Sequence, residues 1–204
     1  KTCAVSAKEL SPIVTLADHS LLLHCGEEDS NAKTKGYSAT LLCLLQLAYG
    51  LGYHKKTVSK ELYDTFVAES LLEIYSLKSL KQKVIDWCEE HQYGKQMSHV
   101  YVIGNGVHLG TAMEGMLKIM ETMCIPSMYS NVMEFSHGMH RSLKQDSFVI
   151  LIKTAEDGDD MTKTYTYLKN KGIHVLMINL CGDQEDDHMM VIPYYSTTAS
   201  LFSV

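Results

Sequence analysis

The stretch that decides the fold is residues 99–110, which read HVYVIGNGVHLG. Its first half, His99–Ile103, is rich in β-branched and aromatic residues, and a short apolar run of this kind predicts a buried strand. Glycines follow at positions 104 and 106, and residues 109–124 then carry apolar side chains at helical spacing. A strand that passes through a glycine-rich turn into a helix is typical of a parallel sheet in an α/β fold.

The same alternation of strand and helix continues toward the C-terminus. Apolar runs predict buried strands at residues 148–152, 175–179 and 189–192, and a polar helix is predicted at residues 161–171. We therefore predict a three-layer α/β fold, in which a flavodoxin-like parallel sheet has helices on both faces.

The N-terminal half has a different pattern. It predicts short strands at residues 2–6 and 20–24, a short helix from Ser11-Pro12, and a longer helix over residues 34–50 with Gly52 as its stop. Two amphipathic helices, residues 58–75 and 77–91, follow without an intervening strand, so they read as a linker between units.

Composition narrows the function classes. The chain has 204 residues, 46% of them hydrophobic, which suits one large or two small globular domains. The net charge is −6 and no cluster of Lys or Arg stands out, so we expect no sequence-independent binding to nucleic acid. No apolar run approaches the ~18 residues of a membrane span, so we expect no membrane partner.

Cysteine usage and the first residues bear on the compartment. Six cysteines are present without a CxxC pair, and we expect buried free thiols in a reducing cytosol, hence a cytoplasmic protein. The chain opens on Lys1 without an initiating Met or a signal peptide, which suggests that a segment before Lys1 has been removed.

The helix after the glycine turn carries a charged stripe. Glu114, Lys118 and Glu121 have the spacing i, i+4, i+7 and fall on one side of an otherwise apolar helix. The stripe is either an exposed face with a Glu–Lys pair or the polar wall of a pocket. In the second case, Lys118 and Glu121 should face a cleft at the carboxyl ends of the strands.

Four motifs occur in a fixed order: AKTKGYS at residues 32–38, GNG at 104–106, EGMLKIME at 114–121 and EFSHG at 134–138. Together they resemble the SIS-domain family of phosphosugar isomerases and fructosamine-phosphate deglycases, including the isomerase half of glucosamine-6-phosphate synthase. The resemblance spans roughly residues 11–193, and the helical linker is its least distinctive part.

The resemblance implies an SIS fold and a role for each matching residue. Glu121 matches the carboxylate that moves a proton between C1 and C2 of the sugar, and Lys118 lines the same site. His137 matches the histidine that assists ring opening, reaching the site of a neighbouring subunit, so a homodimer is expected. The predicted substrate contacts are Asn31, Ala32, Lys33 and Glu114. The chemistry requires a base and proton traffic, with no metal and no cofactor.

The resemblance also implies a division of the chain. Residues 1–56 match the C-terminal part of a first SIS domain, residues 57–98 a helical linker, and residues 99–204 a second SIS domain truncated at its C-terminal end. Two departures stand out, because Lys33 replaces a family serine and Met139 a family proline. The family's phosphate loop, S-x-S-G-x-T, is not found, so the chain reads as an internal fragment of a longer protein.

Several alternatives remain open. A non-catalytic phosphosugar sensor is the rival to an isomerase or deglycase, and an inactive structural remnant is a third reading. The glycine turn could cradle a nucleotide, although its spacing is not G-x-G-x-x-G. The cluster Glu134, His137 and His140 lacks the HExxH order of a metal site, and residues 183–188 lack the order of an EF-hand, so a solvated turn is expected there.

Overall fold

The structure is a computed structural model, and it describes residues 1–95, 97–182, 185–202 and 204. It divides into two compact units, Lys1–Ala68 and Glu69–Val204. The boundary falls inside the long helix α3, Lys60–Glu90, so each unit contains part of that helix. Within the described residues, no helix is both long and apolar enough to cross a lipid bilayer.

The second unit is built on a five-stranded parallel sheet in the order β4-β3-β5-β6-β7. Its strands are β3 (His99–Ile103), β4 (Ser127–Ser130), β5 (Ser147–Lys153), β6 (His174–Asn179) and β7 (Met189–Val191). Its helices are α4 (His108–Met123), α5 (Val132–His137) and α6 (Asp160–Asn170), with short 3-10 turns η1 (Met139–Ser142), η2 (Ala155–Asp157) and η3 (Ala199–Phe202). The predicted three-layer α/β fold with a parallel sheet is confirmed.

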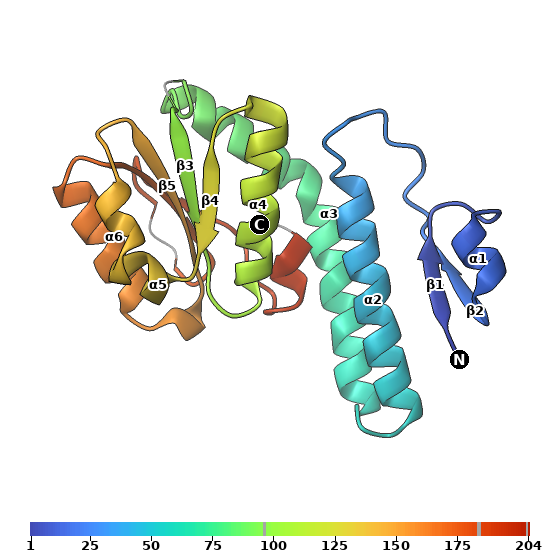
Figure 1. Cartoon of the computed structure of the whole chain (residues 1–204). Coiled ribbons are helices and arrows are strands. Elements are labelled where there is room, and N and C mark those ends of the chain that lie inside the picture. Colours follow the sequence, from blue (N-terminus) through green and yellow to red (C-terminus); the bar gives the residue numbers. More distant parts are fainter. Residues whose placement is uncertain (96, 183–184, 203) are drawn as a thin grey trace. The chain divides into compact units, whose positions relative to one another are not determined.

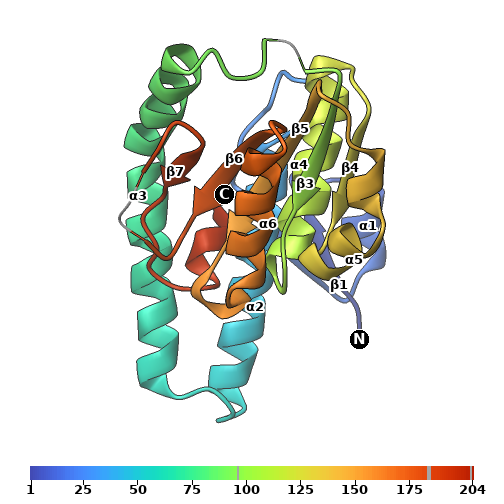
Figure 2. The same cartoon turned by 90° about the vertical axis from the view of Figure 1, so that its left-hand side faces the viewer.

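Side chains that alternate along the strands build a separate core on each face. Tyr101 and Ile103 of β3 point to the face covered by α5 and α6, where they pack with Phe135. Val100 and Val102 point to the opposite face, where they pack with Ala112 of α4 and with the second half of α3. Figures 1 and 2 show α5 and α6 on one side of this sheet and α4 on the other.

The first unit has a smaller framework. Strands β1 (Cys3–Ser6) and β2 (His19–Leu22) form a two-stranded parallel sheet joined by the short helix α1 (Pro12–Leu16). Helix α2 (Lys35–His54) then packs against the start of α3 through a stacked pair of rings, Tyr49 and Phe66, whose centroids lie 4.1 Å apart.

The structure corrects several predicted boundaries. Residues 58–75 and 77–91 are one continuous helix, α3, because no glycine or proline interrupts the helical pattern between them. Gly52 lies inside α2 and does not stop it; an added Cβ there would stand 2.5 Å from Val58, so the glycine allows close packing after the turn. Strand β4 and helix α5 were not predicted at all.

The expected burial of the thiols is also wrong. All six cysteines are free, but Cys3, Cys124 and Cys181 are exposed and the other three are half-buried. The apolar runs that contain them lie on helix flanks and strand ends, where one side faces solvent, so an apolar neighbourhood in sequence did not imply burial.

Candidate functional site

The charged stripe on α4 forms one connected cluster. Lys118 donates a hydrogen bond from Nζ to Oε2 of Glu121 at 2.6 Å, and the same Nζ lies 3.4 Å from Oε1 of Glu114. The hydrogen bond with Glu121, aided by the charge of Glu114, raises the pKa of the Lys118 ammonium, which therefore stays positive near neutral pH. The three predicted residues of this helix are thus brought together, as the spacing indicated.

The cluster is partly open. The side chains of Glu114 and Lys118 are 22% and 21% exposed, and that of Glu121 is 35% exposed. Apolar side chains of the same helix, Met113 and Met123, lie 45% and 44% open beside it. A polar centre with an exposed apolar surround is typical of a surface that contacts something else, because isolated solvent-facing stripes are polar throughout.

The expected position of the cluster is wrong. Helix α4 begins at the carboxyl end of β3 and must return to the amino end of the parallel strand β4, so its last turn lies near the amino ends of the strands. Glu121 is in that last turn. Lys118 and Glu121 therefore do not face a cleft at the carboxyl edge of their own sheet. The other walls of any pocket that they line must come from segments other than the loops of that edge.

The carboxyl edge is closed by its own side chains. Asn105 donates a hydrogen bond from Nδ2 to Asp157 at 2.6 Å, and its Oδ1 accepts one from the backbone N–H of Val132 at 3.0 Å. One amide thus joins the loops that follow β3, β4 and β5. Asp157 also caps η2 by accepting hydrogen bonds from Thr154. Side-chain hydrogen bonds thus tie the loops of this edge to one another.

Local geometry explains the two glycines of this turn. A Cβ on Gly104 would stand 2.4 Å from the carbonyl oxygen of His108, and Gly106 has φ +54°, a left-handed conformation that favours glycine. The His108 ring is buried and bonds to Thr111 and Ser200, at 3.2 and 3.1 Å. Burial lowers the pKa of His108, so it is a neutral part of the framework.

His137 lies apart from the cluster on α4. It is the last residue of α5, which covers the opposite face of the sheet, and its side chain is exposed. Asn131 begins this helix by accepting a hydrogen bond from the N–H of Glu134 at 2.8 Å. Within this unit, His137 and Glu121 are therefore not assembled into one site.

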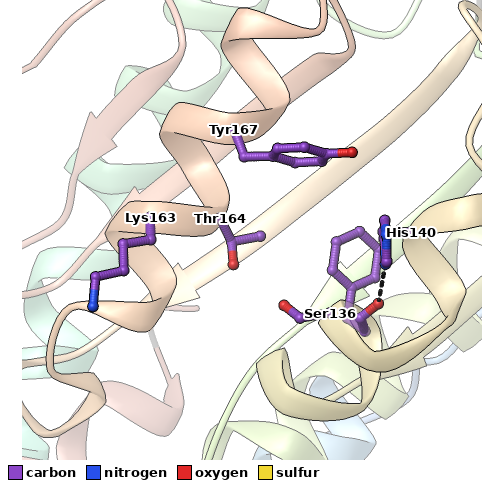
Figure 3. Close-up of a pocket in the computed structure, with 6 residues that line it drawn as sticks. Ser136, His140, Lys163, Thr164 and Tyr167 are labelled. Carbon is purple, nitrogen blue, oxygen red and sulfur yellow. Dashed lines mark hydrogen bonds between the residues drawn. The ribbon is translucent and has the colours of Figure 1, made fainter.

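A small cavity lies between α5 and α6. Its volume is about 280 Å³, and Figure 3 shows the rings of Tyr167 and His140 on one side and the hydroxyls of Thr164 and Ser136 facing the gap. The His140 ring bonds through Nδ1 to the carbonyl oxygen of Phe135 at 3.3 Å. Neither His137 nor Glu121 lines this cavity.

The predicted sugar-contact loop belongs to the first unit and is built around Glu28. Oε1 of Glu28 accepts hydrogen bonds from the backbone N–H of Thr34 at 2.7 Å and of Lys35 at 2.9 Å, and Oε2 accepts one from Gly36 at 3.1 Å. These bonds lower the pKa of Glu28 to about 2. The carboxylate thereby satisfies the free N–H groups at the start of α2.

Sequence reasoning missed Glu28, although a glutamate six residues before Thr34 was visible. Lys33, predicted as a substrate contact, bends back to donate a hydrogen bond to the carbonyl oxygen of Glu28 at 3.1 Å. Asn31 and Ala32 lie between these two anchored ends, Asn31 exposed and Ala32 half-buried. The loop is thus held from within, which leaves its tip presented at the surface.

The suspected metal sites find no support in geometry. Among the residues that the structure describes, no three His, Cys, Asp or Glu side chains converge closely enough to hold a metal ion. Asp186 of the acidic run instead accepts hydrogen bonds from Tyr165 at 2.8 Å and Lys169 at 3.1 Å. Residues 183 and 184 of that run lie outside the described residues.

Comparison with known proteins agrees with this architecture. Residues 95–189 match the family described as the SIS domain. The second unit carries an SIS domain. Among solved structures, a candidate phosphosugar isomerase from Clostridium difficile superposes with a TM-score of 0.84 at 25% identity, covering 98% of this chain and 60% of that one. The C-terminal domain of glucosamine-fructose-6-phosphate aminotransferase from Francisella tularensis, at 16% identity and TM-score 0.81 over 98% and 59% of the two chains, shares the fold.

Curated relatives are similar to this chain over most of its length. Glutamine–fructose-6-phosphate aminotransferase (isomerizing) from Caldanaerobacter subterraneus is 29% identical over 168 residues, which is 78% of this chain and 26% of the relative. The enzyme of the same name from Cyanidium caldarium is 28% identical over 201 residues, 95% of this chain and 32% of the relative. The chain thus spans about a quarter to a third of the length of these relatives.

Proposed function

We propose that the chain binds a phosphosugar and contributes to aldose–ketose isomerisation, or to deglycation of an amino-sugar phosphate, with Glu121 as the proton-transfer base. The observation that carries the proposal is the Glu114–Lys118–Glu121 cluster on α4 of an SIS domain. Relatives and structural neighbours named as phosphosugar isomerases support the substrate class.

The chemistry assigns each member of the cluster a step. Glu121 takes the proton from the carbon next to the carbonyl, the C–H electron pair forms the double bond of an enediolate, and the carbonyl π pair moves onto its oxygen. A proton then passes from the neighbouring hydroxyl to this oxygen, and Glu121 returns its proton to the former carbonyl carbon. Lys118, which stays charged, stabilises the negative charge that develops on the oxygen. Glu114 holds the Lys118 ammonium from its other side.

The remaining residues complete the site from other segments. Asn31, Ala32 and Lys33 contact the sugar from the loop that Glu28 anchors, and His137 assists ring opening in the site of a neighbouring subunit of a homodimer. Residues 1–56, 57–98 and 99–204 then serve as the end of a first SIS domain, a linker and a second SIS domain. The protein acts in the cytoplasm without metal or cofactor.

The test measures solvent exchange in the protein at its full natural length. Fructose 6-phosphate, glucosamine 6-phosphate and fructoselysine 6-phosphate are incubated in D₂O, and deuterium at C1 or C2 is followed by NMR. We expect exchange with one of them, a loss of 10²–10⁴-fold in Glu121→Gln, and no loss in the control Glu89→Gln, which removes an exposed carboxylate of α3.

Two outcomes would contradict the proposal. Exchange that survives in Glu121→Gln would remove this residue as the base while leaving the substrate class intact. Saturable binding of a sugar phosphate without exchange in the unmodified protein would favour the sensor over the enzyme.

A further inference from the structure

A second cavity in the SIS unit lies at the amino ends of the central strands and serves no step proposed above. Its volume is about 350 Å³, and it is formed where α3 ends, where β5 and β6 begin, and just before β7. Its titratable lining consists of three histidines, a lysine, a tyrosine and one aspartate: His91, His174, His188, Lys95, Tyr93 and Asp187. Basic groups thus outnumber the single carboxylate.

Two of the imidazole rings are held in fixed planes. The His91 ring stacks on Trp87 with centroids 4.4 Å apart, and the His174 ring stacks on Phe148 at the same distance with an interplanar angle of 7°. The Nδ1 atom of His91 lies 2.9 Å from the carbonyl oxygen of Trp87, so this nitrogen carries a proton. Its Nε2 lies 3.6 Å from Oδ1 of Asp187 and can also receive a ligand.

Tyr93 lines the cavity, although its hydroxyl does not open into it. Its hydroxyl is buried, and none of the residues that the structure describes gives it a hydrogen bond. Burial raises the pKa of Tyr93, so the hydroxyl keeps its proton throughout the accessible pH range. The hydroxyl oxygen has almost no accessible surface, so Tyr93 contributes a wall to the cavity rather than a donor.

The two acids that precede Asp187 are engaged elsewhere. Glu185 pairs with Lys83, and Asp186 pairs with Tyr165 and Lys169. Asp187 is left as the carboxylate of the lining, and its side chain is 89% exposed, so solvent screens its charge. His91 also follows the last turn of α3, and the carbonyl end of a helix stabilises a protonated imidazole.

We propose that this cavity binds a dianionic tetrahedral oxyanion, either inorganic phosphate or the phosphate group of a small monoester. Lys95 supplies positive charge, and the rings of His91, His174 and His188 supply N–H donors. The volume of the cavity exceeds that of one phosphate group, so part of the group esterified to the phosphate would also fit. The site is independent of Glu121.

The first experiment uses sulfate, which stays dianionic between pH 5.5 and 8, so that any pH dependence of binding belongs to the protein. Calorimetric titration should show saturable binding. His174→Gln and Lys95→Gln should each weaken binding about tenfold, the effect of losing one charged hydrogen bond. His54→Gln, on α2 of the first unit, is the matched control and should change nothing.

A second arm separates the two sources of the oxyanion. Glycerol phosphate that binds more tightly than inorganic phosphate identifies a monoester, and equal affinities identify the free ion. Because Lys95 is exposed, Lys95→Gln leaves the core intact even if His174→Gln fails to fold, which circular dichroism would detect. The proposal is overturned if sulfate does not saturate, or if Lys95→Gln binds it as tightly as the unmodified protein. Glu121→Gln should bind sulfate normally, so this result is separable from the isomerase test.

Discussion

The two units are stabilised in different ways. The second unit has three clusters of buried apolar side chains around its sheet, whereas Ala4 and Phe66 are the buried hydrophobic residues of the first unit within the described chain. In the first unit, Leu10 and Leu16 are 92% and 85% exposed. A two-stranded sheet without a core is marginal by itself. The comparison indicates that the second unit folds on its own contacts, while the first is shaped mainly by local polar bonds.

The largest expected effect tests this difference directly. Leu151 of β5 is fully buried, so Leu151→Ala should lower the free energy of unfolding of the second unit by about 2–5 kcal/mol. Leu16→Ala should change the free energy of unfolding of the first unit by less than about 0.5 kcal/mol. In urea denaturation, the fluorescence of Trp87, the one tryptophan of the chain, reports on the second unit, and far-UV circular dichroism reports on both units. Equal costs for the two substitutions would break the comparison.

Two glycines of the second unit test how tightly its parts are packed. Gly104→Ala should cost about 1–3 kcal/mol, because the new methyl group would meet the carbonyl oxygen of His108. Gly110→Ala, six residues later on α4, has nothing within 4 Å and should stabilise by about 0.4–1 kcal/mol. The same denaturation measures both. If Gly104→Ala were neutral, the turn at the carboxyl edge would be looser than its hydrogen bonds indicate.

Much of the second unit could be predicted from the sequence. Strands such as His99–Ile103 are continuous apolar runs, which is what a strand covered on both faces requires. The cluster on α4 was also predictable, because the positions of Glu114, Lys118 and Glu121 on one helix follow from helical geometry alone.

The other features of the fold and the site depend on contacts between distant residues, which a local sequence pattern cannot predict. Strand β4 reads SMYS and has two exposed residues, so it lacks the apolar run that marks its neighbours. The position of Glu121 near the amino ends follows from the return path of α4 between two parallel strands, one of which was not predicted. The role of Glu28 depends on a turn of the chain that brings its carboxylate to three backbone N–H groups.

Acid should loosen the first unit before it affects the core of the second. The pKa of Glu28 is lowered to about 2 from an ordinary 4.5, so its contribution is complete above pH 4.5 and is lost as the pH falls toward 2. The protection factors of the Thr34, Lys35 and Gly36 amides should fall over this range and should already be low in Glu28→Gln. Glu27→Gln, the adjacent carboxylate, should leave these amides protected. Unchanged exchange in Glu28→Gln would show that other contacts hold the loop.

The smallest effect is expected at the cluster that carries the proposed chemistry. Glu114→Gln removes one partner of Lys118, a partly exposed pair four residues apart, and should cost about 0.2–0.5 kcal/mol that disappears at high salt. Denaturation at low and at high salt measures both. A salt-independent loss above about 1 kcal/mol would mean that the cluster holds α4 in place. A small loss means that these charges contribute little to folding.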